Sequence, residues 1–406
     1  MKWRWFVPGR LEVFGKHTDY AGGRTLVGAV PKGITVSAWP TATNQVIVTD
    51  VGRVPMERIA TGRPAPESPP HADSAVFPVR DCGPYHGWRR YVATVITRLA
   101  RNFPEANLSC TIEFQSTLPR AAGISSSSAL VTAIAEVLIA RGEIENLPLW
   151  RETIRTAEDR AAYFACIENG AAFGPLSGDA GVGTHGGSED HAAILMSRAG
   201  FLQQLSFSPL QRDRLVAMPA CWTFVVASTG IRARKAGEVR YNYNLAAASA
   251  AAIVSLWRER YPQDERTLAQ LAREEPLATL HLSSDLRSRL EHFVREDRRV
   301  VEAGDAFARG DVAAIGELSD ASQRDATTLL RNQVPETLDL VADARAEGAA
   351  AACGFGAGWG GSVWALVRSD EAEAFLERWL MAFEARHPNL VPEGFLSPPS
   401  DGITRL

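Results

Sequence analysis

The chain has 406 residues, of which 46% are hydrophobic and 22% charged, a composition typical of a globular protein with room for two cored domains. Its formal net charge of -4 excludes the broad basic surface by which many proteins attract nucleic acid, so we expect no nucleic-acid partner. Five widely separated cysteines without a CxxC pair predict neither a disulfide framework nor a zinc site, and they fit a reducing cytoplasm.

The first fifty residues begin without a signal-peptide pattern and continue as a sheet-rich segment. MKWRWFVPGR has no apolar core of the signal-peptide kind, and no later apolar run is long and continuous enough to span a bilayer. We therefore expect a cytoplasmic protein without a membrane partner. The β-type runs are separated by turn residues and read LEVF, ITVSAWP and QVIVTD. Residues 58–84 are rich in Pro, Gly and Asp, which predicts an exposed loop.

Helix and strand patterns then alternate. Apolar residues recur at helical spacing over residues 87–103 and alternate as in a strand over residues 108–118. Helices are predicted from Ser125 to Gly142 and over residues 150–169, and the second of them leads into a Gly-rich segment.

A return to strands follows at AAILM, FLQQLSF and WTFVVAS, which predicts a domain boundary in this region. We divide the chain into an N-terminal domain, residues 1–205, and a C-terminal domain, residues 206–406. The C-terminal domain is richer in helix, and near its end a Gly-rich loop precedes the apolar strand SVWALV and a last helix. This mixture predicts an α+β fold with antiparallel strands rather than a doubly wound sheet.

The strongest candidate for an anion site is the loop Leu118–Ile124 together with the four serines Ser125–Ser128. It lies between a predicted strand and a predicted helix, where small residues let a phosphate approach and the unpaired amides of the helix start attract it. An alternative is that the serines only cap the helix. The sequence has no GxxxxGK[ST] match, so a Walker-type loop is not the explanation.

A second Gly-rich element covers residues 353–362 and contains GxGxxG at Gly356, Gly358 and Gly361. A dinucleotide-binding fingerprint follows a strand and opens a helix, whereas this element runs directly into a strand. We interpret it as a tight loop that another backbone or a substrate approaches closely.

Five separated motifs, in this order, resemble galactokinase-like members of the GHMP kinase family. They are PGRLEVFGKHTDYAGG from Pro8, WRRYV from Trp88, LPRAAGISSSSAL, GSEDH and GFGAGWGGSVWALV. The resemblance covers nearly the whole chain. It implies a two-lobed α+β GHMP kinase fold, with an N-terminal lobe like the second domain of ribosomal protein S5 and a ferredoxin-like C-terminal lobe. It also implies that ATP and a small sugar or polyol bind in the cleft between the lobes.

The resemblance further implies roles for residues at matching positions. Arg10 is expected to face the transferring phosphoryl group, where a fixed cation offsets developing negative charge. Asp190 is expected to orient or deprotonate the reacting hydroxyl. Asp19 and His17 would hydrogen-bond sugar hydroxyls. The other implied substrate contacts are Gly187, against which the sugar would lie, and Tyr243 or Tyr241, one of which would cover it.

At the nucleotide end, the resemblance implies that Trp88 stacks on adenine. The phosphates would lie against the loop residues Ala122, Gly123, Ser125, Ser126, Ser127 and Ser128. Ser126 or Ser127, together with Glu168, would help to hold Mg²⁺, which prefers hard oxygen ligands.

The sequence departs from the galactokinase pattern at the substrate end. Lys16 stands where these kinases usually carry Glu, and a lysine can only donate hydrogen bonds. An anionic substituent on the substrate, such as a uronate carboxylate or a phosphate, is one interpretation. Compensation by Glu12, which stands where the family often has Asn, is the other and leaves galactose as substrate. The stretch between Glu168 and Asp190 is also longer than usual, which predicts an extra loop beside the substrate.

We therefore expect a kinase that transfers the γ-phosphoryl group of ATP to a sugar hydroxyl, the anomeric one, as in the conversion of galactose to galactose 1-phosphate. The alternatives are a kinase of a uronate, a heptose phosphate or a cyclitol and, more remotely, a sugar and ATP sensor without turnover. A sensor needs no groups for proton and charge handling, so the presence of both Arg10 and Asp190 argues against it.

Overall fold

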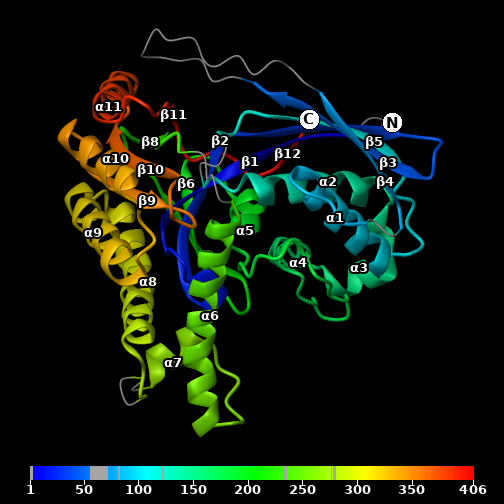
Figure 1. Ribbon diagram of the computed structural model, residues 1–406, viewed down its shortest axis with the longest axis horizontal. Coiled ribbons are helices and arrows are strands. Elements are labelled where there is room, and N and C mark those ends of the chain that lie inside the picture. The colour runs from blue at the N-terminus through cyan, green and yellow to red at the C-terminus, as the bar shows by residue number, and fades with distance from the viewer. Residues whose placement is uncertain are drawn as a thin grey trace.

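Two sheets, each packed against helices, make up the computed structural model (Figure 1). The structure describes residues 3–54, 72–80, 83–119, 123–231, 236–275, 277 and 280–406. Among these described residues, every strand pair in both sheets is antiparallel except β3 with β5, in agreement with the α+β prediction. In the described part of the chain, no helix combines the length and the apolar character needed to cross a bilayer.

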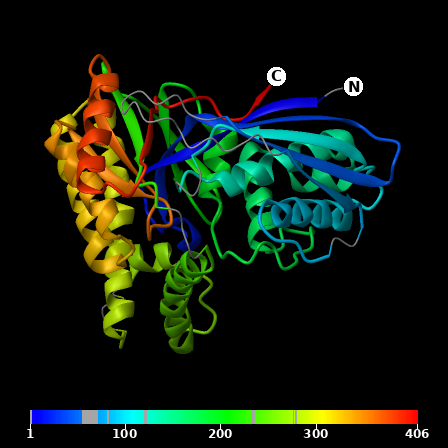
Figure 2. The same ribbon diagram turned by 45° about the horizontal axis from the view of Figure 1, so that its top comes forward.

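The larger sheet has eight strands and contains both ends of the chain. Its main order is β12-β1-β2-β5-β3-β4, and β6 joins β2 on one side and β7 on the other. The N- and C-termini lie close together because β12 pairs with β1 (Figures 1 and 2). The strands are β1 (Trp3–Phe14), β2 (Arg24–Pro40), β3 (Gln45–Arg53), β4 (Asp73–Pro78), β5 (Cys110–Ser116), β6 (Phe201–Ser206), β7 (Gln211–Ala217) and β12 (Thr404–Arg405).

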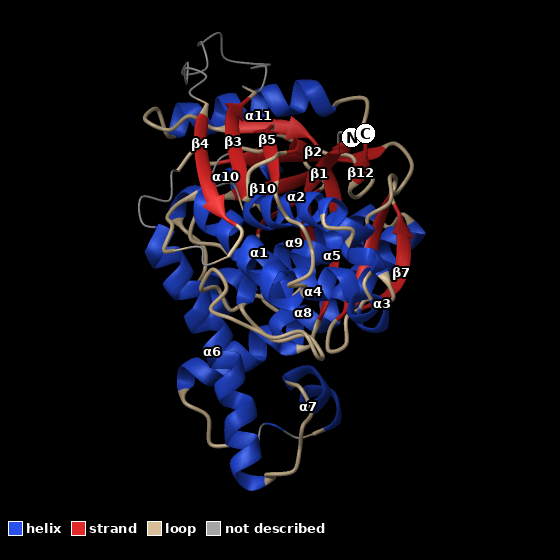
Figure 3. Cartoon of the chain, turned by 90° about the vertical axis from the view of Figure 1, so that its right-hand side faces the viewer, coloured by secondary structure: helices blue, strands red, loops and turns tan. Residues whose placement is uncertain are grey.

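A layer of helices lies under this sheet (Figure 3). At its centre is α2, a helix of Leu, Ile, Val and Ala side chains that are buried all round, as expected for a helix between a sheet and further helices. The helices of this layer are α1 (Trp88–Asn102), α2 (Ser126–Arg141), α3 (Pro148–Thr153), α4 (Ala157–Asn169) and α5 (Glu189–Met196), with single turns η1 (Asp19–Ala21) and η2 (Ile144–Asn146).

The smaller sheet has four strands in the order β11-β8-β10-β9 and is covered on both faces. The alternate residues of β8 and β10 divide between two cores, one with α10 and α11 and the other with α8, α9 and β1. The elements are β8 (Trp222–Ser228), β9 (Ala351–Phe355), β10 (Ser362–Arg368), β11 (Glu393–Leu396), α8 (Ser284–Arg309), α9 (Val312–Asp325), η4 (Ala326–Leu330), α10 (Pro335–Ala346) and α11 (Ala372–Arg386).

A third core lies below the two sheets. It joins α6 (Ala236–Arg260) and α7 (Leu268–Glu274) to the first part of α8, and these helices project from the rest of the molecule (Figures 1 and 2). β7 and β12 lie beyond residue 205 and still belong to the larger sheet. The proposed division into 1–205 and 206–406 therefore separates these two strands from the other strands of their sheet.

Three predicted elements differ from the structure. The helix predicted over residues 150–169 is broken, because Thr156 and Asp159 form a capping box that starts α4 anew. The predicted strand AAILM is instead the buried helix α5, and a short apolar run has no period that distinguishes the two. The predicted loop over residues 58–84 contains strand β4, whereas residues 58–71 and 81–82 lie outside the described part.

The turn after β1 is tied to the helices of the smaller sheet by a buried ion cluster. Lys16 Nζ lies 3.9 Å from Glu296 Oε1 on α8 and donates to Ser322 Oγ at 2.8 Å and Cys353 Sγ at 3.2 Å. Glu296 also accepts from the Gly15 amide at 3.0 Å. Burial works against its charge, but Lys16 and then Arg299 outweigh it and lower the pKa of Glu296 to about 2.

Replacement of Lys16 by Met should destabilise the protein. The substitution leaves Glu296 buried without one of its counterions, and breaking a buried pair in this way costs about 3–5 kcal/mol. We expect a loss of that order in the free energy of unfolding, measured by urea titration. Arg298→Met is the control, because its exposed pair with Glu302 is worth about 0.5 kcal/mol or less. An unchanged urea midpoint for the Lys16 variant would contradict this account.

Candidate active site

A buried arginine on β1 forms the centre of the site. Register shifts in the β1–β2 ladder fall on both sides of Arg10, between Pro8 and Arg10 and between Glu12 and Phe14. Such bulges redirect a side chain out of the regular alternation of a strand. Arg10 Nη1 donates to the Gly123 carbonyl at 2.6 Å, and its backbone amide donates to the Ile124 carbonyl at 3.3 Å. The larger sheet therefore holds the predicted phosphate loop directly.

Three carboxyl groups surround the guanidinium of Arg10. Its Nε lies 2.7 Å from Asp190 Oδ1 and 3.1 Å from Glu189 Oε1, and its Nη2 lies 3.9 Å from Glu12 Oε2. Burial lowers the pKa of Arg10, but Asp190, Glu189 and Glu12 together outweigh burial and raise that pKa above its usual value. The guanidinium is therefore a permanent cation.

The carboxyl groups do not share the negative charge equally. Burial would raise the pKa of Asp190, but Arg10 outweighs it, so that this pKa lies below its ordinary value. Burial raises the pKa of Glu12 to about 7 and that of Glu189 well above its usual range. Of the three side chains only that of Asp190 is appreciably exposed, at 30%. The charged and accessible partner of Arg10 is thus Asp190.

Glu189 was not predicted as a site residue. The only signal for it in the sequence is its place beside Asp190 in the GSEDH segment. Both residues lie in the first turn of α5, where the helix dipole favours acidic side chains.

Three helices bring polar side chains together behind Asp190. The Ser128 hydroxyl on α2 lies 2.8 Å from Glu168 Oε2 on α4 and 3.3 Å from Asp190 Oδ2 on α5, so it can donate to either carboxylate. Burial raises the pKa of Glu168 to about 7, and the hydrogen bond from Ser128 offsets part of that rise. His191 Nε2 lies 3.3 Å from Glu168 Oε2, and burial lowers the pKa of this imidazole to about 4, which leaves it neutral.

The start of α2 is open to an anion. Ser125 is the N-cap residue but has a left-handed backbone, with φ of 57°, and its side chain does not cap the helix. Its buried hydroxyl has no hydrogen-bond partner of good geometry among the described residues, and it helps to lower the pKa of the neighbouring Asp190 carboxyl. Ser126 is exposed and Ser127 is half-buried. The interpretation that the serines serve only as caps is therefore not supported by Ser125, the residue in the capping position.

The two Gly-rich loops meet at this point. A β-carbon on Gly356, which has φ of 77°, would lie 2.8 Å from the Gly123 carbonyl oxygen. The predicted close approach of another backbone is therefore present, and glycine is required for it. Ala122, which we also predicted to bind phosphate, lies outside the described residues.

The oxygen-rich surroundings of α2 fit Mg²⁺. Glu168 supplies a carboxylate and the serines supply hydroxyls, which are the hard ligands this ion prefers. Among the described residues, no three His, Cys, Asp or Glu side chains gather into a metal site. A magnesium ion here would therefore be held by few protein ligands together with phosphate oxygens, as is usual for Mg²⁺.

His17 is held by contacts with its neighbours. Its Nδ1 lies 2.8 Å from the Tyr20 hydroxyl and its Nε2 lies 2.9 Å from the Ala357 carbonyl, so both ring nitrogens already have protein partners. Burial, followed by the charge of Arg289, lowers the pKa of His17 to about 3 and keeps the ring neutral. Tyr243 packs against it with ring centroids 5.1 Å apart.

Asp19 lies beside Gly187, the residue whose backbone we predicted to contact the substrate. Its Oδ1 accepts from the Tyr20 amide at 2.8 Å, and its Oδ2 accepts from the Glu189 amide at 3.4 Å. A β-carbon on Gly187 would lie only 2.3 Å from Oδ2, so this position must be glycine. Burial, and then the charge of Asp190, raise the pKa of Asp19 to about 6.

Two predicted substrate contacts lie away from this group. Tyr241 is 66% exposed on α6, so Tyr243 is the tyrosine that the structure brings to His17. Lys16 is wholly buried, and its ammonium is directed toward Glu296, Ser322 and Cys353.

Trp88 stands at the first position of α1 and is half-buried. Its indole nitrogen donates to Asp73 Oδ2 at 3.0 Å, and its ring packs edge-on against Phe114 at 5.5 Å. The Arg89 guanidinium lies 5.0 Å from the centre of the same indole. The contact of Trp88 with adenine stays a prediction.

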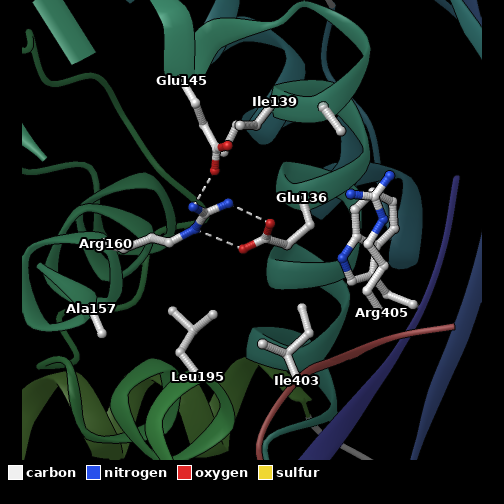
Figure 4. Close-up of a pocket in the computed structure, with 10 residues that line it drawn as sticks. Glu136, Ile139, Glu145, Ala157, Arg160, Leu195, Ile403 and Arg405 are labelled. Atoms are coloured by element: carbon white, nitrogen blue, oxygen red, sulfur yellow. Dashed lines mark hydrogen bonds and ion pairs between the residues drawn. The ribbon is translucent and has the colours of Figure 1, made fainter. Parts of the chain in front are cut away.

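A separate cavity of about 360 Å³ lies at the other ends of α2, α4 and α5 (Figure 4). Arg160 of α4 forms an ion pair across it with Glu136 of α2 and a second pair with Glu145 at 2.5 Å. Leu195 of α5 and Ile403 form an apolar wall. None of the predicted site residues that the structure describes lines this cavity, so we assign the ion pair a structural role in joining α2 to α4.

Three family models match the chain. Residues 2–40 match the galactokinase galactose-binding signature, residues 90–198 match the GHMP kinases N terminal domain, and residues 305–385 match the GHMP kinases C terminal model.

Curated relatives and solved structures agree with these matches. The galactokinase of Thermococcus kodakarensis is 27% identical over 99% of this chain and 100% of its own length, and that of Exiguobacterium sibiricum is 26% identical over 94% and 88%. A crystal structure of Lactococcus lactis galactokinase complexed with galactose superposes with a TM-score of 0.80 at 23% identity, over 100% of this chain and 95% of that one. L. major mevalonate kinase gives 0.58 at 16% identity, over 98% and 96%. The two-lobed fold is thereby confirmed.

The raised pKa of Glu168 predicts how stability depends on pH. Between about pH 4.5 and pH 7 the unfolded chain has lost this proton while the folded protein keeps it, so stability falls as the pH rises through this window. The contribution is at most about 3 kcal/mol. The Glu168→Gln variant lacks this pH-dependent contribution. Its free energy of unfolding relative to the unmodified protein should therefore increase between pH 5 and pH 8, measured by urea unfolding without ligands. Glu302→Gln on the surface of α8 is the control, and a constant difference for Glu168→Gln would refute the assignment.

Proposed function

We propose that this chain, which is a galactokinase-like member of the GHMP kinase family, transfers the γ-phosphoryl group of ATP to the anomeric hydroxyl of galactose. One observation carries the proposal: the accessible carboxylate of Asp190 is paired with the buried cation Arg10 at the open start of α2. These are the groups that a phosphoryl transfer needs for the acceptor proton, the developing charge and the phosphates.

Asp190 is the group that receives the sugar hydroxyl. Arg10 keeps it ionised, so it accepts a hydrogen bond from the hydroxyl and orients the oxygen for attack on phosphorus. The proton passes to Asp190 as the new O–P bond forms and the bond from the γ-phosphorus to the bridging oxygen of ADP breaks, with ADP as the leaving group. Because its pKa is low, Asp190 contributes more through position than through basicity.

Arg10 stabilises the charge that spreads over the phosphoryl oxygens during transfer. Its hydrogen bond to the Gly123 carbonyl and its ion pair with Asp190 fix the guanidinium before substrate arrives, so little reorganisation is needed. Burial raises the pKa of both Glu189 and Glu12, so the main negative charge beside the guanidinium is that of Asp190.

The start of α2 is the proposed site of the ATP phosphates. The open amides there, with Ala122, Gly123 and the hydroxyls of Ser125–Ser128, would bind them, and Trp88 would stack on adenine. Ser126 or Ser127 and Glu168 would hold Mg²⁺, which neutralises phosphate charge and polarises the phosphoryl group.

The proposed galactose site lies between Asp19, His17, Gly187 and Tyr243. The half-buried carboxylate of Asp19 lies next to the Gly187 backbone, and the rings of His17 and Tyr243 give an apolar face. The ammonium of Lys16 is already neutralised by Glu296, which removes the reason to expect an anionic substituent at that position. We also place the protein in the cytoplasm, since the four described cysteines are free thiols.

The purified protein should release ADP from Mg²⁺-ATP when galactose is present. The assay panel also contains a uronate, a heptose phosphate and a cyclitol. Asp190→Asn removes the proton acceptor, and kcat should fall by about 100-fold or more while the KM for ATP changes little. Asp285→Asn, a substitution of an 80% exposed aspartate on α8, is the matched control. The proposal fails if galactose gives no ADP above the Asp190→Asn level. Activity with another member of the panel would then assign a different substrate, and no activity with any member would favour binding without turnover.

A further inference from the structure

Two arginines from different parts of the chain meet beside the loop that leads to Asp190. Arg90 lies on α1 and Arg240 on α6. From the point where a β-carbon on Gly183 would lie, Arg90 Nη2 is 3.1 Å away and Arg240 Nη1 is 3.9 Å away. We propose that this pair, the arginine clamp, is a phosphate-binding site at the edge of the active site. The identity of its ligand rests on the proposed kinase function.

Neither guanidinium of the clamp has an acidic partner in the described part of the chain. The neighbouring arginines of α1 differ in this respect, since Arg89 is paired with Asp73 and Arg98 with Asp179 at 3.0 Å. Two adjacent cations without a counterion repel each other, and an anion between them removes the repulsion. The clamp is accessible to such an anion, because Arg90 is half-buried and Arg240 is exposed.

The clamp lies next to the polar group around α2. Burial and then the charge of Glu168 raise the pKa of Tyr91. Arg90 and Arg240 lie close enough to this phenol to offset part of that rise. The loop itself is joined to α4, because the Val182 amide donates to the Glu168 carbonyl at 2.8 Å. Glu168 in turn is within 2.8 Å of the Ser128 hydroxyl. A ligand in the clamp would therefore lie beside the proposed phosphate site.

The position of the clamp is fixed by a neighbouring side chain. Asn244, one helical turn after Arg240, donates to the Gly183 carbonyl at 3.0 Å and accepts from the His185 amide at 2.9 Å. Both ends of one amide thus hold the loop to α6. Gly183 has φ of 79° and leaves the space beside it to the two guanidinium groups.

Phosphate is the ligand class that fits this arrangement best. Guanidinium groups bind phosphate through paired, charge-assisted hydrogen bonds, and a phosphate has enough oxygens to engage two of them. Two sources of this phosphate are chemically equivalent at the clamp, namely the phosphates of the nucleotide and a phosphate carried by the sugar. The experiment has to separate them.

The test uses binding without turnover. Calorimetric titrations with ADP, adenosine and galactose 1-phosphate compare the unmodified protein with Arg90→Gln, Arg240→Gln and the double variant. Arg287→Gln is the matched control, because Arg287, like Arg240, is an exposed arginine without an ion pair among the described residues. We expect the double variant to lose about 10-fold or more in affinity for the ligand whose phosphate the clamp holds, since charge-assisted bonds are lost.

The outcomes are distinct. A loss for ADP but not for adenosine assigns the nucleotide phosphates to the clamp, and a loss for galactose 1-phosphate alone assigns the sugar phosphate. Affinities for both phosphates equal to those of Arg287→Gln would overturn the proposal. Because no ADP formation is measured, a protein that proved inactive as a kinase could still pass this test, so the two proposals can fail separately.

Discussion

The burial of one positive charge, that of Arg10, constrains most of the site. A guanidinium removed from water is costly unless anions and hydrogen-bond acceptors replace the solvent. Here the replacements come from three places: the strand itself through Glu12, helix α5 through Glu189 and Asp190, and the phosphate loop through the Gly123 carbonyl. The same contacts that stabilise the charge therefore hold the proposed catalytic carboxylate of Asp190 and the proposed phosphate loop in one fixed geometry.

The elements around this site are joined by polar contacts as well as by the core that the two sheets share. The Lys16 cluster ties the turn after β1 to α8, α9 and β9, and Asn244 ties the loop before Asp190 to α6. Position 16 has a lysine where the galactokinase pattern has a glutamate, and the fold accommodates this change of charge. Lys16 is paired with Glu296 on α8, and Glu12 also favours its charged form, so the lysine is compensated from the opposite lobe as well as by Glu12.

Local patterns in the sequence were sufficient for the α+β class, the helix after the serines and the loop nature of the second Gly-rich element. Properties that depend on burial or on distant partners were not accessible. The direction of Lys16 is set by Glu296, 280 residues further on, and the choice between Tyr243 and Tyr241 is set by which side of α6 faces His17. The strand predicted at residues 192–196 was wrong because a short helix buried on all sides has no polar face to reveal its period.

The most direct test of the account is to identify the atom that receives phosphate. Galactose labelled with ¹³C at C1 is incubated with Mg²⁺-ATP and the purified protein, and the product is examined by ³¹P NMR. The proposed function predicts a phosphomonoester whose phosphorus signal is split by the labelled C1 carbon, and this product should be absent with Asp190→Asn. A phosphorylated sugar without that splitting, or no phosphorylated sugar at all, would contradict it.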